Sequence, residues 1–578
     1  RVALMATHSV VPGAETNYLS SPVLLYEEYF KKIEAEIGVF NNPIILKSLA
    51  ITSFFGLLDR NNEELKATLE SNFDIDWNDL WSAIMELNAC EILDVYSNEI
   101  VKVSDQVLAT YSFYKCFIDD KSAVINYAKW IETFIQKYPS RISSTLVDVN
   151  NTFAYTHVRE LVIPHLNQVV INIDSEDKLY SFYTLFWFYK GRECLLYLKK
   201  WIANLADEQA VEVLKFTFVH NDHTTASQYF ALIKNFWNYS NELLKPSIEI
   251  ILELLQKQPS RLSEVLKFMK EDFKYKLRDR DEGYVRQNIL INVLLDTNLS
   301  DSKKLYANGI FLNVVEDLLG WHYTESGPFK GKALTIYNFD LYKSDELIKL
   351  RQRILNGVYD LFEFNNEQIQ KILRQIVYPG GEIDNTIYLE ELPIYEKIIS
   401  QKLDERKYAH CEFVKELSKH FESAGAKVHS NWNTFINSNV MKLSQFLSPD
   451  WEIRDDKSIE ELEQEKRDEF DKFIVENDWK NIEELLYSIS ELYGQKSEAW
   501  HIEYATSDIY VSIAKKGSKE FADALRLFFS GKVMFSLGHA PIIFALQNNI
   551  LSGKEILNIM HMYDFSNKNY WISSLSAM

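Results

Sequence analysis

Two histidine motifs are the first candidates for chemistry in this sequence. His220 and His223 form an H-x-x-H motif, and two imidazoles three residues apart on a helix could share a metal ion. The third ligand would be Asp222, which points elsewhere on a helix. We therefore favour a polar helix start with Asn221 or Asp222 near the cap, and we predict no metal site.

The second motif places His322 between Trp321 and Tyr323. We favour a structural histidine with satisfied ring nitrogens over a catalytic one. Paired carboxylates have no diagnostic value in a chain with 83 acidic residues. We predict no catalytic residue, and we name Trp321, His322 and Tyr323 as candidates for contact with a partner.

A phosphate-binding loop needs glycines that free consecutive N–H groups, then a lysine and a hydroxyl residue. Residues 327–332 have the wrong spacing, and no Ser or Thr follows their lysine. Ser530-Gly-Lys532 and Ser552-Gly-Lys554 lack both the upstream glycine and the following hydroxyl. The sequence therefore contains no P-loop, and we predict that this chain is not an enzyme and holds no cofactor.

The amino-acid composition indicates which kind of secondary structure must hold any functional site in place. Across 578 residues, 62 basic side chains face 83 acidic ones, which gives a net charge of −21. Such a chain lacks the basic face that a general nucleic-acid binder or a basic membrane-surface protein needs. Aromatic residues make up 14%, while Gly (18) and Pro (12) are scarce. This composition favours long packed helices over a turn-rich sandwich or barrel.

The cysteines and the apolar runs indicate the compartment. Cys90, Cys116, Cys194 and Cys411 form no CxxC pair, so we interpret them as reduced thiols. No uncharged apolar run reaches the 18 residues that a membrane span requires. We predict a cytoplasmic protein without a membrane segment.

Helical periodicity dominates the chain. In Asp345–Phe364, apolar residues recur every three or four positions, and Ser344 is a plausible N-cap. A second amphipathic segment begins at Asn365, has Gln368 in a capping-box position, and ends at Pro379-Gly-Gly. Two adjacent amphipathic helices with a short turn are the unit of an α-solenoid. The apolar stripes are Leu347, Leu350, Ile354, Val358 and Leu361, then Ile369, Ile372, Leu373, Ile376 and Val377.

One internal repeat is visible. Residues Phe134–Leu146 align with Leu254–Leu266 through the shared core Gln-Lys-x-Pro-Ser-Arg, at an offset of 120 residues. This offset fits about three helical hairpins. Chance agreement at a joint between two helices is the alternative. In either case the core would end one helix and begin another.

Three segments depart from the amphipathic pattern. Glu91–Val103 indicates a short β-hairpin behind a helix at Asn78–Asn88, a combination typical of a winged helix. Gly320–Leu341 indicates a hairpin inserted between helices. Residues Asp455–Asp471 are mostly charged and predict a solvated helix or a connector.

The chain begins at Arg1 inside what looks like a helix, without an initiator methionine or a signal peptide. We expect it to be the C-terminal part of a longer polypeptide, with a trimmed start as the alternative.

The segment Trp77–Tyr114 resembles the winged-helix region of bacterial STAND NTPases, a class that includes the antiviral (Avs) phage sensors. Arg1-Val-Ala-Leu-Met-Ala is similar to the helix after the "GNPR"-type motif that closes the nucleotide domain in that class. Asp279–Gln287 and the Trp321–Leu341 hairpin are similar to recurring elements of the C-terminal arrays.

The resemblance implies a full-length protein with an effector domain, an ATPase that uses ATP and Mg, and then this chain as a sensor. Arg1 would lie at the edge of the missing nucleotide domain and is the candidate cofactor contact. The sensor would bind a phage terminase or portal, and the ATPase would oligomerise and activate the effector. The sequence departs from the family because no histidine lies between His8 and His157 to contact the nucleotide phosphate.

We therefore expect a mainly α protein: a winged-helix domain followed by an α-solenoid of degenerate, TPR-like helical repeats, with a small β-hairpin insertion. Its partner would be a phage protein, with no direct nucleic-acid contact. A stand-alone α-solenoid adaptor is the alternative, and an enzyme with an unfamiliar helical fold is a third hypothesis. The expected domains are 1–40 (end of an NTPase lid), 41–118 (winged helix), 119–315 (helical repeats), 316–343 (β-hairpin insertion) and 344–578 (C-terminal helical repeats).

Overall fold

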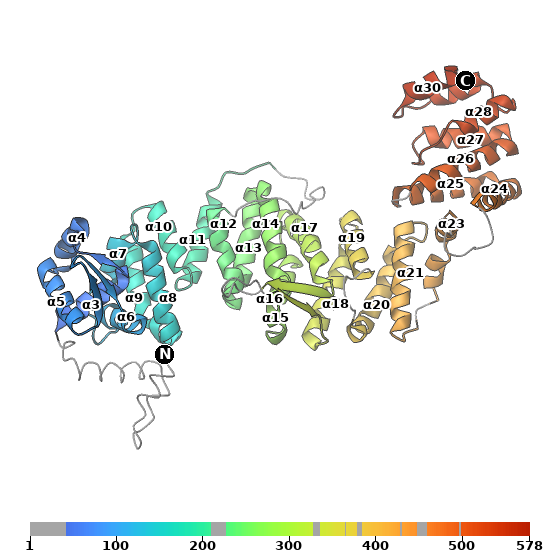
Figure 1. Cartoon of the computed structure of the whole chain (residues 1–578). Coiled ribbons are helices and arrows are strands. Elements are labelled where there is room, and N and C mark those ends of the chain that lie inside the picture. Colours follow the sequence, from blue (N-terminus) through green and yellow to red (C-terminus); the bar gives the residue numbers. More distant parts are fainter. Residues whose placement is uncertain are drawn as a thin grey trace. The chain divides into compact units, whose positions relative to one another are not determined.

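The computed structural model of the chain is mainly helical, which confirms the fold class at that level (Figure 1). The chain divides into two compact units. The N-terminal unit comprises Arg1–Ala206 and Thr225–Ile251, and the C-terminal unit comprises Asp207–Thr224 and Leu252–Met578. The structure describes residues 42–209, 227–326, 336–363, 366–377, 384–427, 430–447, 459–495 and 499–577.

The first described elements of the N-terminal unit are helices around a three-stranded antiparallel sheet of order β1-β3-β2. Val95 and Leu58 both pair with Val101 of the central strand. The predicted hairpin is confirmed, and Ser97 and Asn98 at its turn have positive φ. These elements are α3 (Pro43–Phe55), β1 (Leu58–Asp59), α4 (Glu63–Phe73), α5 (Trp77–Ala89), β2 (Leu93–Tyr96), β3 (Ile100–Val103) and α6 (Gln106–Phe113).

Helices in two alternating rows complete this unit. α6, α8 and α10 pack in one row, and α7 packs on α9 beside it. The unit boundary falls within α13. The remaining elements are the π-helical turn η2 (Tyr114–Ile118), α7 (Tyr127–Phe134), α8 (Pro139–Thr152), α9 (Tyr155–Asn172), α10 (Glu176–Phe186), α11 (Gly191–Ala203), α12 (Gln228–Lys234), η4 (Asn235–Asn238) and α13 (Asn241–Lys257).

In the C-terminal unit, successive helices also fall into two rows. α14, α17, α19 and α21 pack in sequence, and α16, α18 and α20 do likewise. Its first part comprises η5 (Pro259–Arg261), α14 (Leu262–Phe273), α15 (Leu277–Asp281), α16 (Val285–Leu294), α17 (Asp301–Leu318), β4 (His322–Ser326), β5 (Ile336–Asp340), α18 (Asp345–Asp360), α19 (Asn366–Val377), α20 (Asn385–Lys402) and α21 (Tyr408–Ser423).

In its second part, α24 packs on α26, and α26 packs on α28. The charged stretch Asp455–Asp471 is expected to be a solvated helix or a connector, and from Ile459 onward it is helical, as part of α24. Residues 455–458 lie outside the described ranges. This part comprises α22 (Trp432–Ile436), α23 (Asn439–Leu447), α24 (Ile459–Glu476), α25 (Trp479–Gln495), α26 (Ala499–Lys516), α27 (Ser518–Phe529), α28 (Ala540–Gln547), α29 (Gly553–His561) and α30 (Lys568–Ala577).

Both copies of the repeated Gln-Lys-x-Pro-Ser-Arg core lie between helices, as predicted. Pro139 opens α8, and Pro259 opens η5 ahead of α14. Proline suits a first helical position because no N–H donor is needed there. The arginines differ: Arg261 donates to Glu264 at 3.1 Å, whereas the Arg141 guanidinium lies against Gly56, where a Cβ would be 2.8 Å from Nη1. The repeat therefore encodes a helix joint and not a shared contact.

The helix predicted from Asp345 is confirmed, and its start is as expected. The Ser344 hydroxyl accepts a hydrogen bond from the Leu347 N–H at 3.2 Å. The helix ends at Asp360, before Phe364, where the C-cap Leu361 leaves the helical range with φ −95° and ψ 9°. The predicted stripe of α19 is buried throughout. Asn365 and Pro379-Gly-Gly lie outside the described residues.

His410 of α21 predicts a pH dependence of stability. Burial lowers its pKa to about 4, with Lys407 adding to the effect and Asp404 opposing it. The unfolded chain, with a pKa of about 6.5, therefore binds more protons between these values, so stability falls as pH drops from 6.5 to 4. The full loss from this group is about 3 kcal/mol. Urea unfolding at several pH values should show a flatter profile for His410→Asn.

The amide oxygen of that variant preserves an acceptor for the Asp404 N–H, which donates to His410 Nδ1 at 3.0 Å. His561→Asn, at an exposed histidine, is the matched control and should leave the profile unchanged. Equal slopes for His410→Asn and the parent chain would contradict the expectation.

Candidate functional site

The inserted hairpin that the sequence singled out is present between α17 and α18, as β4 and β5 (Figure 1). Its strands pair antiparallel, with Tyr323 opposite Phe339 and Glu325 opposite Tyr337 on one face. The other face carries polar pairs that satisfy each other. His322 Nδ1 lies 2.8 Å from Asp340 Oδ1, and Thr324 donates to Asn338 Oδ1 at 2.9 Å. Cross-strand pairs of this kind hold the register.

Tyr323 fixes the base of the hairpin to the helices. Its hydroxyl lies 2.8 Å from the Asp317 carbonyl oxygen and 2.9 Å from that of Gly320, both of which can accept its hydrogen bond. Its ring packs edge-to-face on Tyr275, 5.1 Å away. Burial holds the pKa of Tyr323 well above its ordinary value. The hydroxyl therefore stays protonated and acts as a structural donor.

A buried ion pair lies directly beneath the hairpin. Arg351 of α18 donates through Nε to Glu391 of α20, and both side chains are fully buried. Arg351 Nη1 also donates to the Leu319 and Gly320 carbonyls at 3.3 and 3.2 Å. The guanidinium carbon lies 4.1 Å from the centroid of the Trp321 ring, a cation–π contact. One cation thus joins two helices to the first residues of the hairpin.

The charge of Arg351 is firmly set. Burial by itself would lower the pKa of Arg351, but the charge and hydrogen bonds of Glu391 raise it above its ordinary value. Tyr395 donates to Glu391 Oε2 at 2.8 Å and satisfies the second carboxylate oxygen. The geometry is that of a structural ion pair without access for a substrate.

The structure brings the hairpin together with the other singled-out segment, Asp279–Gln287. Asp279 is buried and accepts from the Lys276 N–H at 2.8 Å and from the Gln287 side chain at 2.7 Å. Burial raises the pKa of Asp279. The Leu277 N–H donates to Glu325 of β4 at 2.9 Å, which joins the two segments directly. Within Asp279–Gln287, Gly283 and Tyr284 form a turn in which both residues have positive φ.

The predicted partner contacts must be corrected for two of three residues. Trp321 and Tyr323 are only 1% and 2% exposed, because they fill the core between the hairpin and the helices. Neither side chain can contact a partner directly in this structure. His322 remains at the surface, paired with Asp340. Arg1, His220 and His223 lie outside the described residues.

Exposed apolar side chains surround the same hairpin instead. Tyr337 and Tyr342 are 47% and 56% exposed, and Ile336 and Leu277 are exposed to a similar degree. Arg280 of α15 lies with its guanidinium carbon 5.3 Å from the centroid of the Tyr342 ring. We call Leu277, Ile336, Tyr337 and Tyr342 the hairpin surface. The hairpin that carries part of this surface is held to the helices by the buried hydrogen bonds of Tyr323 and Arg351.

Two features are absent from the part of the chain that the structure describes. Within those residues, no cluster of three metal-ligating side chains occurs, and no helix is long and apolar enough to cross a membrane. All four cysteines are free thiols. Comparisons with models of known families, with curated proteins and with solved structures found no match.

Proposed function

We propose that this chain is the sensor region of a STAND-type antiviral ATPase, which binds a phage protein such as a terminase or portal. Binding would trigger oligomerisation through an ATPase encoded upstream, which uses ATP and Mg, and would activate its effector. The observation that carries the proposal is the hairpin surface. Exposed aromatic side chains on a base held by buried hydrogen bonds and an ion pair are typical of the residues that dominate protein interfaces.

The order of elements in the N-terminal unit supports a winged helix. Helix α3, strand β1, helices α4 and α5, and the hairpin β2–β3 follow one another as in that domain. The exposed face of α5, which would be the recognition helix, carries no basic side chain. A DNA-reading helix needs such side chains for phosphates and bases, so a role in protein contacts is favoured. The exposed residues are Asn78, Asp79, Ser82, Met85, Glu86 and Ala89.

The alternating rows of helices support a solenoid of degenerate repeats. Between α14 and α21, one row is formed by α14, α17, α19 and α21, and the other by α16, α18 and α20, with each helix packed on the next one in its row. Stacked helical pairs of this kind bury a continuous core and leave one edge of every pair for binding. The hairpin is inserted in the chain between α17 and α18, and it adds a distinct surface to the stacked helices.

Removing the aromatic rings of the hairpin surface should abolish partner binding without unfolding the chain. We expect Tyr337→Ser combined with Tyr342→Ser to weaken capture of the phage partner at least about ten-fold, because interface aromatics carry most of the affinity. The measurement is a titration of the purified chain against a panel of phage terminases and portals. Thermal unfolding should be unchanged, since both rings are about half exposed.

Tyr96→Ser provides the matched control, because Tyr96 is 54% exposed on a strand of the other hairpin. It should leave binding unchanged. Stable capture of host proteins alone would favour a stand-alone adaptor. Equal binding by the double variant and the parent chain would remove the hairpin surface from the recognition site.

A further inference from the structure

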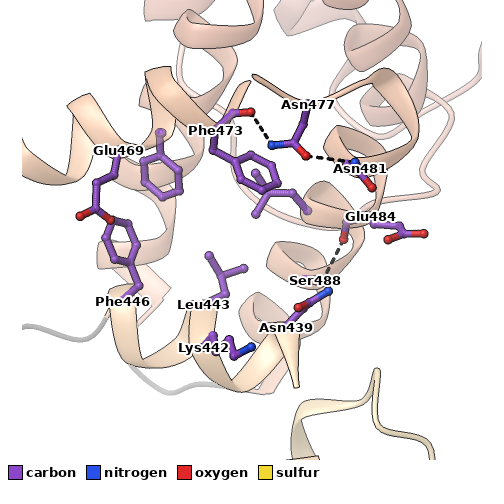
Figure 2. A pocket seen from close by; sticks show the side chains of 12 residues that line it. Asn439, Lys442, Leu443, Phe446, Glu469, Phe473, Asn477, Asn481, Glu484 and Ser488 are labelled. Carbon is purple, nitrogen blue, oxygen red and sulfur yellow. Dashed lines mark hydrogen bonds between the residues drawn. The ribbon is translucent and has the colours of Figure 1, made fainter. Parts of the chain in front are cut away.

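A separate pocket lies far along the chain from the hairpin, in the second part of the C-terminal unit. Helices α23, α24 and α25 enclose a cavity of about 480 Å³ (Figure 2). This volume falls within the range of pockets that bind small molecules or the side chains of a peptide. None of its lining residues belongs to the hairpin surface, so it is an independent candidate site.

The inner wall of the pocket is apolar. Phe446 of α23 packs edge-to-face on Phe470 of α24, with ring centroids 5.2 Å apart. Leu443 and Phe473 point into the same hollow in Figure 2. Phe473 is 38% exposed, although the next residue along α24, Ile474, is completely buried. An aromatic ring at the mouth of an apolar hollow offers surface to an apolar ligand.

The rim of the pocket is polar and rich in acceptors. Asn481 Nδ2 donates to Asn477 Oδ1 at 3.0 Å, and Asn477 Nδ2 donates to the Phe473 carbonyl at 2.9 Å. These bonds fix the orientation of both side-chain amides. The Asn481 side-chain oxygen therefore points away from Asn477. Glu484 follows one turn later on α25, and Glu469 stands on the opposite wall in Figure 2. Lys442 is the basic side chain among the lining residues.

The surrounding helix strengthens this negative potential. Among the side chains of α24 that the structure describes, six carboxylates stand against three basic groups. An apolar groove between helices with an acidic border matches an amphipathic helix whose polar face is basic. We propose that this pocket binds the apolar face of a basic amphipathic helix from a partner protein. Apolar side chains of that helix contact Phe446 and Phe473, and its lysines or arginines pair with Glu469 and Glu484.

The test uses fluorescence anisotropy with the full chain and a labelled leucine–lysine peptide of roughly 14 residues, about four helical turns. We expect it to bind at least about ten-fold more tightly than a peptide of equal composition with its leucines spread around the helix. A leucine–glutamate peptide of the same pattern should not bind. Phe473→Ser and Glu484→Lys should each weaken binding about ten-fold.

Val475→Ser is the matched control, because Val475 is 67% exposed on the same helix but does not line the pocket. Equal affinity for the patterned and scrambled peptides would overturn the proposal, because it would show general electrostatic attraction. So would equal affinity of Phe473→Ser and the parent chain. Binding that emerges only after residues 448–458 are replaced by a Gly-Ser linker would assign the pocket to that segment of the chain itself.

Discussion

Replacing Arg351 by methionine should destabilise the C-terminal unit by about 3–5 kcal/mol. The substitution leaves the Glu391 carboxylate fully buried without its cation. It also removes the donor to the Leu319 and Gly320 carbonyls, just before the hairpin begins. Hydrogen exchange should therefore accelerate in α18, α20 and β4 together. Tyr395 alone cannot compensate, since a neutral hydroxyl replaces neither the charge nor the geometry of a guanidinium.

A second substitution distinguishes a buried charge from a packing defect. Combined with Glu391→Leu, Arg351→Met should recover much of the lost stability, because no uncompensated charge remains. The control is Arg526→Met, which breaks a half-buried pair with Asp523 and should cost at most about 1 kcal/mol. If the double variant were as unstable as the sum of both single variants, the ion pair would not explain the loss.

Much of the local structure could be predicted from the sequence, because it depends on neighbouring residues. The Ser344 cap, both hairpins and the helix joints at Pro139 and Pro259 rest on local backbone chemistry, and the structure has all of them. Strand β1 was missed. It has only two residues, Leu58 and Asp59, and exists because β3 offers an edge for pairing.

The site was harder to predict, because it depends on contacts between distant segments. Trp321 and Tyr323 are of the residue types that are common at interfaces, yet both are buried, where Tyr323 packs on Tyr275 and Trp321 packs on Tyr388 of α20. One sequence signal was available for the ion pair. Arg351 and Glu391 occupy positions within the apolar stripes of α18 and α20, where a charged residue indicates a buried partner. Which partner it is depends on how the helices stack.

The N-terminal unit shows how packing joins segments that sequence analysis separates. The expected boundary at residue 118 divides the winged helix from the first repeats. Trp130 of α7 lies beyond it, but its ring centroid is 5.2 Å from Phe54 of α3 and 5.0 Å from Phe73 of α4. Phe117 and Phe134 complete the cluster. The aromatic core is therefore continuous across residue 118.

Trp130→Ala should consequently destabilise the whole N-terminal unit, by about 3–5 kcal/mol, because truncating a fully buried tryptophan removes apolar contacts and leaves a cavity. Hydrogen exchange should accelerate in α3 and α4 as well as in α7. The control is Trp201→Ala, at a half-buried ring stacked on Tyr229, which should cost less and leave α3 unaffected. Faster exchange in α7 alone would show that the segment before residue 118 folds independently.

Trp130→Phe distinguishes the contribution of the aromatic ring to stability from that of the indole N–H. The Trp130 indole N–H is buried and has no hydrogen-bond partner among the described residues. Phenylalanine removes this unsatisfied donor and still fills much of the cavity, so it should cost less than half as much as alanine. A loss equal to that of alanine would mean that the N–H has a partner, such as an ordered water. An intact aromatic core keeps α7 in direct side-chain contact with α3 and α4, and the sensor function proposed above would use such contacts to couple these segments.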